Sequence, residues 1–186
     1  MQEETPNCAR CPYKVSDRIC RTNEGNAPDF CPTKNMSACV EQSLEAYDKD
    51  DGVGEFAKQA SIQEAEGYMN REPGYGHVRA QKTRIEEIMG FAEKMAYKRL
   101  GIAFCIGLRK EAGVVEKVFS AAGFDVISVV CKVGGVSKEQ IGVAKEQQID
   151  PKAEEAMCNP VSQAMVLNRA KTHFNVLLGL CVGHDS

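Results

Sequence analysis

Three short apolar runs alternate with two helical patterns in the second half of the chain, and this alternation limits the fold more than any other feature. The runs lie at residues 100–108, 124–133 and 175–183, and the second is rich in β-branched residues. Apolar runs of this length are typical of strands that are buried on both faces. Strands and helices in this order predict a parallel sheet with crossover helices. We therefore predict an α/β fold of the Rossmann-like, three-layer kind.

The connections between these strands contain three sequence patterns that predict helices. Residues 111–122 place valines at helical spacing. Asn159 and Pro160 predict the start of a second helix, because Asn is a favoured N-cap and Pro is favoured at the next position. Between them, Ser137 and Gln140 match a capping box, which predicts a short helix that ends near residue 148.

The first 40 residues differ in kind from the rest. They contain five of the nine cysteines and four of the seven prolines, with little apolar material. A segment of that composition keeps a shape only through a cross-link or a bound metal. Helical patterns then continue to residue 99. We predict three parts: a cysteine-rich metal-binding segment (1–40), a helical region (41–99) and the α/β domain (100–186).

Four of the five early cysteines have the spacing of a metal site. Cys8 and Cys11 form a C-x-x-C pair, which brings two thiolates to one ion from a tight turn, and Cys20 and Cys31 follow. Four thiolates satisfy either tetrahedral zinc or the four corners of a [4Fe–4S] cluster, and the irregular spacing leaves both open. Cys39 lies where a helix is expected to begin, and we predict that it is not a ligand.

Charge and hydropathy bear on partners and location. The chain has 23 Lys and Arg against 26 Asp and Glu, a net charge of −3, which argues against a nucleic-acid groove. No run approaches the roughly 18 apolar residues of a membrane-spanning helix. The first residues lack the features of a secretory signal, so we expect a cytoplasmic protein with reduced thiols. A small molecule or another protein is the expected partner.

Three of the later cysteines are predicted to converge. Cys131 and Cys181 lie near the ends of predicted strands, and the carboxyl ends of parallel strands share the edge where ligands bind in α/β folds. Cys158 directly precedes the expected N-cap, where the helix dipole stabilises a thiolate. Cys105 lies within the first predicted strand, and because Phe104 and Ile106 flank it we predict that it packs in the core.

This convergent set has two chemical uses, besides the plain alternative that buried cysteines pack as small apolar residues. The three thiolates with His184 would bind a metal or a cluster with an open corner. Alternatively, Cys158 is a catalytic nucleophile, with His184 as its base and Asp185 orienting the imidazole. Cys131 and Cys181 are then the cofactor-binding residues.

Several longer motifs resemble a known family. They are the runs at residues 83–89, 101–112, 128–134, 157–160 and 179–186. Together with the leading C-x-x-C, they are similar to an uncharacterised prokaryotic family of cysteine-rich metal-binding proteins, the domain of unknown function numbered 1847. The resemblance implies metal binding by cysteines, an α/β body and no assigned reaction. Family members continue past the Gly-His-Asp-Ser motif at 183–186, so it also implies a shortened chain with an exposed sheet edge that favours a homo-oligomer.

Two functions remain open from the sequence. The first is a metal-binding protein whose N-terminal cysteines hold zinc or a [4Fe–4S] cluster, and whose α/β domain performs redox or thiol chemistry in a cysteine-lined pocket. The second is a non-enzymatic module, in which structural zinc stabilises a domain that docks a partner or senses metal.

Overall fold

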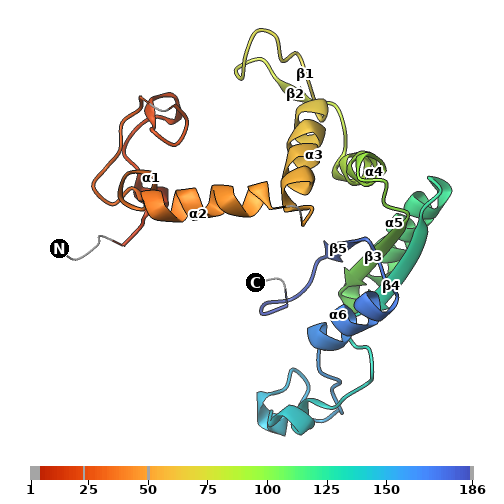
Figure 1. Cartoon of the computed structure of the whole chain (residues 1–186). Coiled ribbons are helices and arrows are strands. Elements are labelled where there is room, and N and C mark those ends of the chain that lie inside the picture. Colours follow the sequence, from red (N-terminus) through yellow and green to blue (C-terminus); the bar gives the residue numbers. More distant parts are fainter. Residues whose placement is uncertain (1–4, 23, 50, 185–186) are drawn as a thin grey trace. The chain divides into compact units, whose positions relative to one another are not determined.

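The computed structural model describes residues 5–22, 24–49 and 51–184, and the chain divides into two units, Met1–Ala60 and Ser61–Ser186 (Figure 1). The division lies within helix α3, whereas the sequence predicted three parts with boundaries after residues 40 and 99. That three-part organisation stays a prediction about which segments fold independently. Within the described segments, every helix is too short or too polar to cross a membrane.

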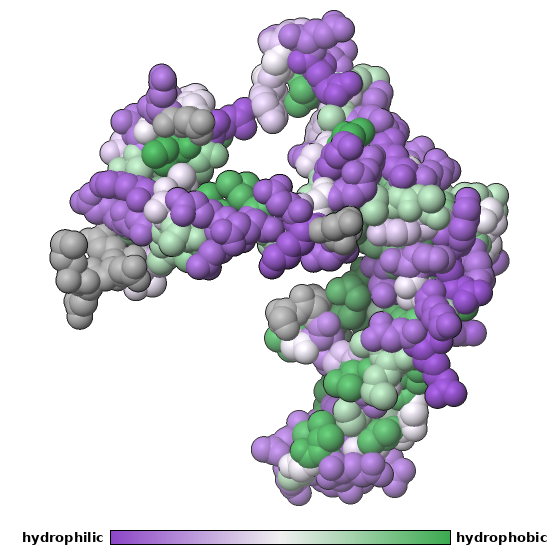
Figure 2. All heavy atoms as spheres, viewed as in Figure 1, coloured by the Kyte–Doolittle hydropathy of each residue, from purple (hydrophilic) through white to green (hydrophobic). Residues whose placement is uncertain are grey.

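The first unit has helices and turns but no apolar core of its own. Its elements are η1 (Cys8–Arg10), η2 (Val15–Asp17), α1 (Pro32–Asn35), α2 (Ser37–Asp48) and the beginning of α3 (Val53–Glu66). None of its described residues is buried. The apolar side chains of α2, including Val40, Leu44 and Tyr47, are exposed, and Figure 2 shows apolar surface along this helix. Burial of apolar surface therefore does not account for the shape of this unit.

The second unit holds the sheet. Its elements are β1 (Tyr68–Met69), β2 (Arg79–Ala80), α4 (Arg84–Lys94), β3 (Arg99–Phe104), η3 (Ile106–Leu108), α5 (Arg109–Ala121), β4 (Asp125–Val130), η4 (Lys138–Ile141), η5 (Lys145–Gln147), α6 (Pro160–Arg169) and β5 (Phe174–Leu178). Strands β1 and β2 form a short antiparallel ribbon. The larger sheet has the order β4-β3-β5, and both of its pairs are parallel. The predicted α/β class with a parallel sheet is confirmed.

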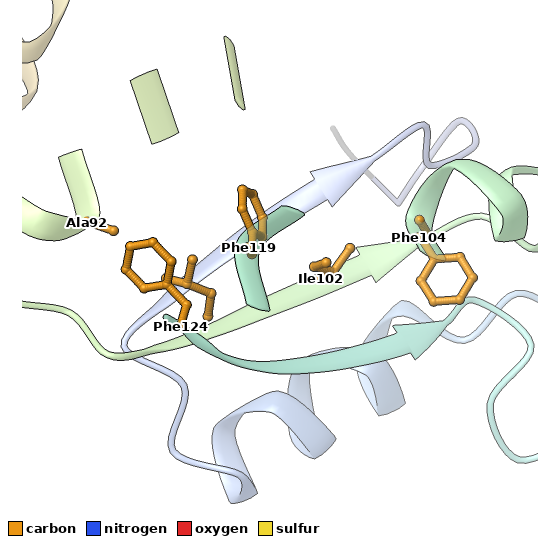
Figure 3. Packing of buried hydrophobic residues seen from close by; sticks show 7 residues of the cluster. Ala92, Ile102, Phe104, Phe119 and Phe124 are labelled. Carbon is orange, nitrogen blue, oxygen red and sulfur yellow. The ribbon is translucent and has the colours of Figure 1, made fainter. Parts of the chain in front are cut away.

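The central strand β3 packs on both of its faces. One face carries Leu100, Ile102 and Phe104, which form a cluster with Phe119 of α5 and Ala92 of α4. Figure 3 shows these aromatic and aliphatic side chains on one side of the sheet, with α6 on the other side. Period-two alternation explains the arrangement, because successive side chains of a strand point to opposite faces.

The opposite face of the sheet is covered by α6. Ala103 and Val129 pack there against Leu167 of the helix. Gly101 lies beneath the same helix, and an added Cβ would come within 2.9 Å of the Leu167 side chain. The small residues of β3 thus let α6 approach closely, so helices cover both faces.

The connection between β4 and α6 differs from the expectation. Instead of one short helix from Ser137, it forms two 3-10 turns, η4 and η5. The Ser137 hydroxyl accepts a hydrogen bond from the Glu139 N–H, and Gly142, with φ of 83°, ends the first turn in the left-handed region. The predicted start of α6 is confirmed, because the Asn159 side chain accepts a hydrogen bond from the Ser162 N–H at 2.9 Å.

Candidate functional site

The N-terminal cysteine group, defined as Cys8, Cys11, Cys20 and Cys31, lines one cavity of about 50 Å³. A tight turn brings the first two together, since the Cys11 N–H donates to the Cys8 carbonyl at 3.2 Å. Cys31 is the N-cap residue of α1. Cys39 does not line this cavity but lies in α2. The spacing alone assigned these four cysteines to one group, and the structure places all four around the same cavity.

A backbone bridge between residues 18 and 26 supports this cavity. The Ile19 N–H donates to the Asn26 carbonyl at 3.0 Å, directly before Cys20. Gly25 packs so closely on this bridge that an added Cβ would overlap the backbone at Arg18. A glycine is required there because backbone cannot move aside as a flexible side chain can.

The surroundings of the Cys31 sulfur favour its ionised form, the thiolate. Partial burial opposes ionisation, but the pKa of this thiol lies below its ordinary value because N–H groups of Lys34 and Thr33 donate to it. A thiolate is the form that binds a metal. Across residues 5–22, 24–49 and 51–184, however, no three His, Cys, Asp or Glu side chains are arranged so that they hold a metal ion. Metal binding by the N-terminal cysteine group therefore stays a prediction.

A second group, the sheet-edge cysteines, comprises Cys105, Cys131, Cys158 and Cys181. Cys105 follows β3, Cys131 follows β4, and Cys181 lies three residues beyond β5. Backbone hydrogen bonds continue the sheet at these ends, because the Cys105 N–H donates to the Leu178 carbonyl at 3.2 Å. The Asn159 N–H, one residue after Cys158, donates to the Cys131 carbonyl at 2.7 Å. Four separate segments thus deliver one cysteine each to the same edge.

Two sulfur atoms of this group lie close together, and one of them accepts a hydrogen bond from the backbone. The Cys158 and Cys131 sulfurs are 3.9 Å apart. The Ile106 N–H donates to the Cys131 sulfur at 3.3 Å. The structure therefore brings Cys131 and Cys158 together, and the predicted convergence of both with Cys181 stays a prediction.

The surroundings of Cys105, Cys131 and Cys181 shift the pKa values of the three thiols in different directions. The pKa of Cys105 lies below its ordinary value, because the Gly107 N–H donates to its sulfur and the neighbouring thiols of Cys181 and Cys131 donate as well. The same contact with Cys105 raises the pKa of Cys181. Burial raises the pKa of Cys131. Cys105 is consequently the member of this trio whose pKa is lowered, whereas the pKa values of Cys131 and Cys181 are raised.

These opposite shifts predict a pH dependence. Iodoacetamide alkylates the thiolate, so the initial alkylation rate of Cys105 should rise with pH through a midpoint below the value of an unperturbed thiol. The midpoint for Cys181 should lie above that value, because its proton is held by the contact with Cys105. Peptide mapping by mass spectrometry at several pH values measures both. Faster alkylation of Cys181 than of Cys105 at pH 7 would contradict the assignment.

The predicted catalytic set is only partly described. Cys158 contacts Cys131 as given above. The His184 N–H donates to the Cys181 carbonyl at 3.0 Å, and its buried Nδ1 has no hydrogen-bond partner among the residues the structure describes. Asp185 lies outside the described residues. The roles of Cys158, His184 and Asp185 in catalysis therefore stay predictions.

Cys105 is the site residue that sequence reasoning missed. Its apolar neighbours suggested a core position, but β3 ends at Phe104 and the chain turns into η3 at once. The apolar run continues past Cys105 to Leu108, so no signal in the sequence indicated that the strand ends at Phe104. Placement at the carboxyl end of a strand was more informative than the hydropathy of adjacent residues.

Comparison with known proteins supports one family. The family described as "protein of unknown function (DUF1847)" matches residues 31–186, a range that contains all four sheet-edge cysteines. An uncharacterised protein of Methanocaldococcus jannaschii is 36 % identical over 178 residues, which cover 96 % of this chain and 77 % of that protein. No solved structure matches the chain. With most of its length matched by the family, the chain belongs to DUF1847.

Proposed function

We propose that the cysteine-rich segment at residues 1–40 is a metal-binding module, in which the N-terminal cysteine group holds a zinc ion or a [4Fe–4S] cluster. The observation that carries this proposal is the shared cavity: all four cysteines line it, and Cys39 does not. Four thiolates complete a closed tetrahedral zinc site and equally provide the four ligands of a cluster.

The absence of burial in the described part of the first unit supports the same proposal. A segment of this size that buries no residue of its own requires another source of folding free energy. Metal binding supplies it, because the ligands are brought together only in the folded state. Zinc would act as a structural cross-link, whereas a cluster would add the capacity to transfer an electron.

We infer that the second unit is a Rossmann-like domain and that the protein works in the cytoplasm. Three parallel strands with helices on both faces support the first inference. All nine cysteines are free thiols, which suits a reducing compartment.

Elemental analysis with matched variants tests the metal site. We expect protein purified without oxygen to contain about one zinc, or about four iron and four sulfide, per N-terminal group. Cys11→Ser and Cys31→Ser should each lose most of that content because a closed site has lost one of its four ligands. Cys39→Ser is the control, and it should keep the wild-type content. Full content in both ligand variants would refute the proposal.

The same measurement separates the two expected functions. A brown protein with iron and sulfide supports redox function, since a cluster changes its charge by one electron. A colourless protein with one zinc supports the structural module. Content above one site would indicate that the sheet-edge cysteines also bind metal.

A further inference from the structure

The connection between β4 and α6 begins and ends in two segments that run antiparallel to each other, residues 131–138 and 155–159, here called the stem. An antiparallel bridge joins Ser137 to Ala156. Three backbone hydrogen bonds of 2.9, 2.7 and 2.7 Å run from the N–H groups of Lys138, Met157 and Asn159 to the carbonyls of Glu155, Val136 and Cys131. The two segments are therefore held side by side along their length.

Side chains reinforce the stem. The Lys138 ammonium and the Glu155 carboxylate form an ion pair across it, and both side chains are largely shielded from water. The Lys132 ammonium donates to the Ala156 carbonyl at 2.6 Å. These contacts order the stem while all of its thiols are reduced.

The base of the stem brings two thiols together. Cys131 directly follows β4, and Cys158 directly precedes Asn159, the N-cap of α6. The two sulfurs are 3.9 Å apart. The peptide group that follows Cys158 bonds to the Cys131 carbonyl, so the two backbones are already adjacent. A disulfide needs about 2.05 Å between its sulfurs, so rotation of the side chains supplies the remaining approach.

The two thiols differ in access. Cys131 is only 1 % exposed, and its sulfur is held in place because it accepts a hydrogen bond from the Ile106 N–H at 3.3 Å. Cys158 is half-buried, so a small oxidant has access to this cysteine rather than to Cys131. An accessible thiol beside a second thiol is the arrangement in which one cysteine is oxidised first and the other resolves the product.

We propose that Cys131 and Cys158 are a reversible switch that responds to peroxide, in which a disulfide across the base of the stem locks the connection between β4 and α6. The Cys158 sulfur attacks one peroxide oxygen and becomes a sulfenic acid, while the O–O bond breaks and the thiol proton leaves with the other oxygen as water. The Cys131 sulfur then attacks the sulfenic sulfur, whose S–O bond breaks, and the hydroxyl leaves with the Cys131 proton as a second water. The two thiols lose two electrons, and the peroxide gains them.

The lock acts on a segment at the edge of the sheet where ligands bind in α/β folds. The disulfide closes a loop that contains both 3-10 turns, η4 and η5, and so restricts the opening of the stem. The proposal uses no residue of the N-terminal cysteine group, and both of its cysteines lie within the range matched by the family. It also differs from the catalytic hypothesis for Cys158, because it requires neither His184 nor Asp185.

The test uses the full chain, reduced and purified without oxygen, with hydrogen peroxide as the probe. The two cysteines fall in separate tryptic peptides, residues 118–132 and 153–169, and neither peptide contains another cysteine. In the wild-type protein we expect mass spectrometry to find these peptides joined by a disulfide, which dithiothreitol should separate. In Cys131→Ser the sulfenic acid on Cys158 should persist, so dimedone should label it at least about tenfold more than in the wild type. In Cys158→Ser the oxidation of Cys131 should be at least about tenfold slower.

Cys105→Ser is the matched control, since it removes another thiol of the same edge but neither member of the pair. It should join the two peptides at a rate within about twofold of the wild type. The proposal is overturned if Cys131 or Cys158 is joined mainly to another cysteine, or if Cys158→Ser is oxidised at the wild-type rate. Equal dimedone labelling of the wild type and Cys131→Ser would also overturn it, as would protection of both thiols from excess peroxide by a bound metal.

Hydrogen exchange tests the lock itself. The amides of Met157 and Asn159 donate across the stem, so they exchange when the stem opens. Oxidation of the wild-type protein should slow their exchange by roughly tenfold or more, and dithiothreitol should restore the original rate. Peroxide should leave the exchange of these amides unchanged in Cys131→Ser. Equal exchange in the oxidised and reduced wild-type protein would overturn the lock.

Discussion

If the proposed metal is bound, its removal is expected to convert the cysteine-rich segment at residues 1–40 from a protease-resistant segment into a protease-sensitive one. No described residue of this segment is buried, so in the proposed module the cysteine–metal bonds would be its main cross-links. Structural zinc sites supply about 10–16 kcal/mol of apparent free energy at neutral pH. Without this free energy, the four cysteines are no longer held around one cavity. Cleavage by trypsin after Arg10 and Arg18 should therefore accelerate by at least about a hundredfold.

Two independent routes to the metal-free state keep this experiment conclusive. One is treatment of the wild-type protein with a chelator, and the other is Cys11→Ser without a chelator. Cys39→Ser in the presence of metal is the control, and it should resist trypsin as the wild type does. Cleavage after Arg99, which begins the central strand β3, should stay slow throughout because that strand is paired on both sides. Equal cleavage after Arg10 with and without metal would show that another interaction orders this segment.

The fold class was predictable because β3 and β4 are short and apolar and are separated by a clear helix. Their ends were less predictable, since the apolar runs continue beyond the strands. The first run was read to Leu108, but β3 ends at Phe104, and Ile106 after it is half exposed. Hydropathy records which side chains are apolar, whereas strand length depends on where the neighbouring strands supply hydrogen bonds. The order β4-β3-β5 is likewise a property of pairing between distant segments.

The two cysteine groups show what spacing can and cannot predict. Cys8 and Cys11 were assigned to one group from local spacing, and a 3-10 turn does place them on the same cavity. The sheet-edge cysteines are separated by more than 20 residues, so only the topology brings them together. The carboxyl ends of neighbouring parallel strands lie at one edge of the sheet, so the topology places both Cys105 and Cys131 there. Cys105 was omitted because its apolar neighbours were given more weight than its position.

Phe119→Ala is expected to destabilise the second unit more than any other single side-chain truncation in α5. The ring is fully buried and belongs to the cluster formed with Ile102 and Phe104 of β3. Its removal loses the transfer free energy of the ring and leaves a cavity between helix and sheet. Substitutions of this kind cost about 3–5 kcal/mol. Hydrogen exchange of the β3 amides measures the loss, because these amides exchange only when the sheet unfolds.

Val114→Ala is the matched control, since Val114 lies on the same helix but is 59 % exposed. Its truncation should change the exchange free energy of β3 by no more than about 0.5 kcal/mol. The metal content of the N-terminal group should be unchanged in Phe119→Ala, because that group lies in the other unit. Loss of metal in this variant would show that the two units depend on each other for folding. An exchange free energy equal to that of Val114→Ala would show instead that the cluster around Phe119 does not hold α5 on the sheet.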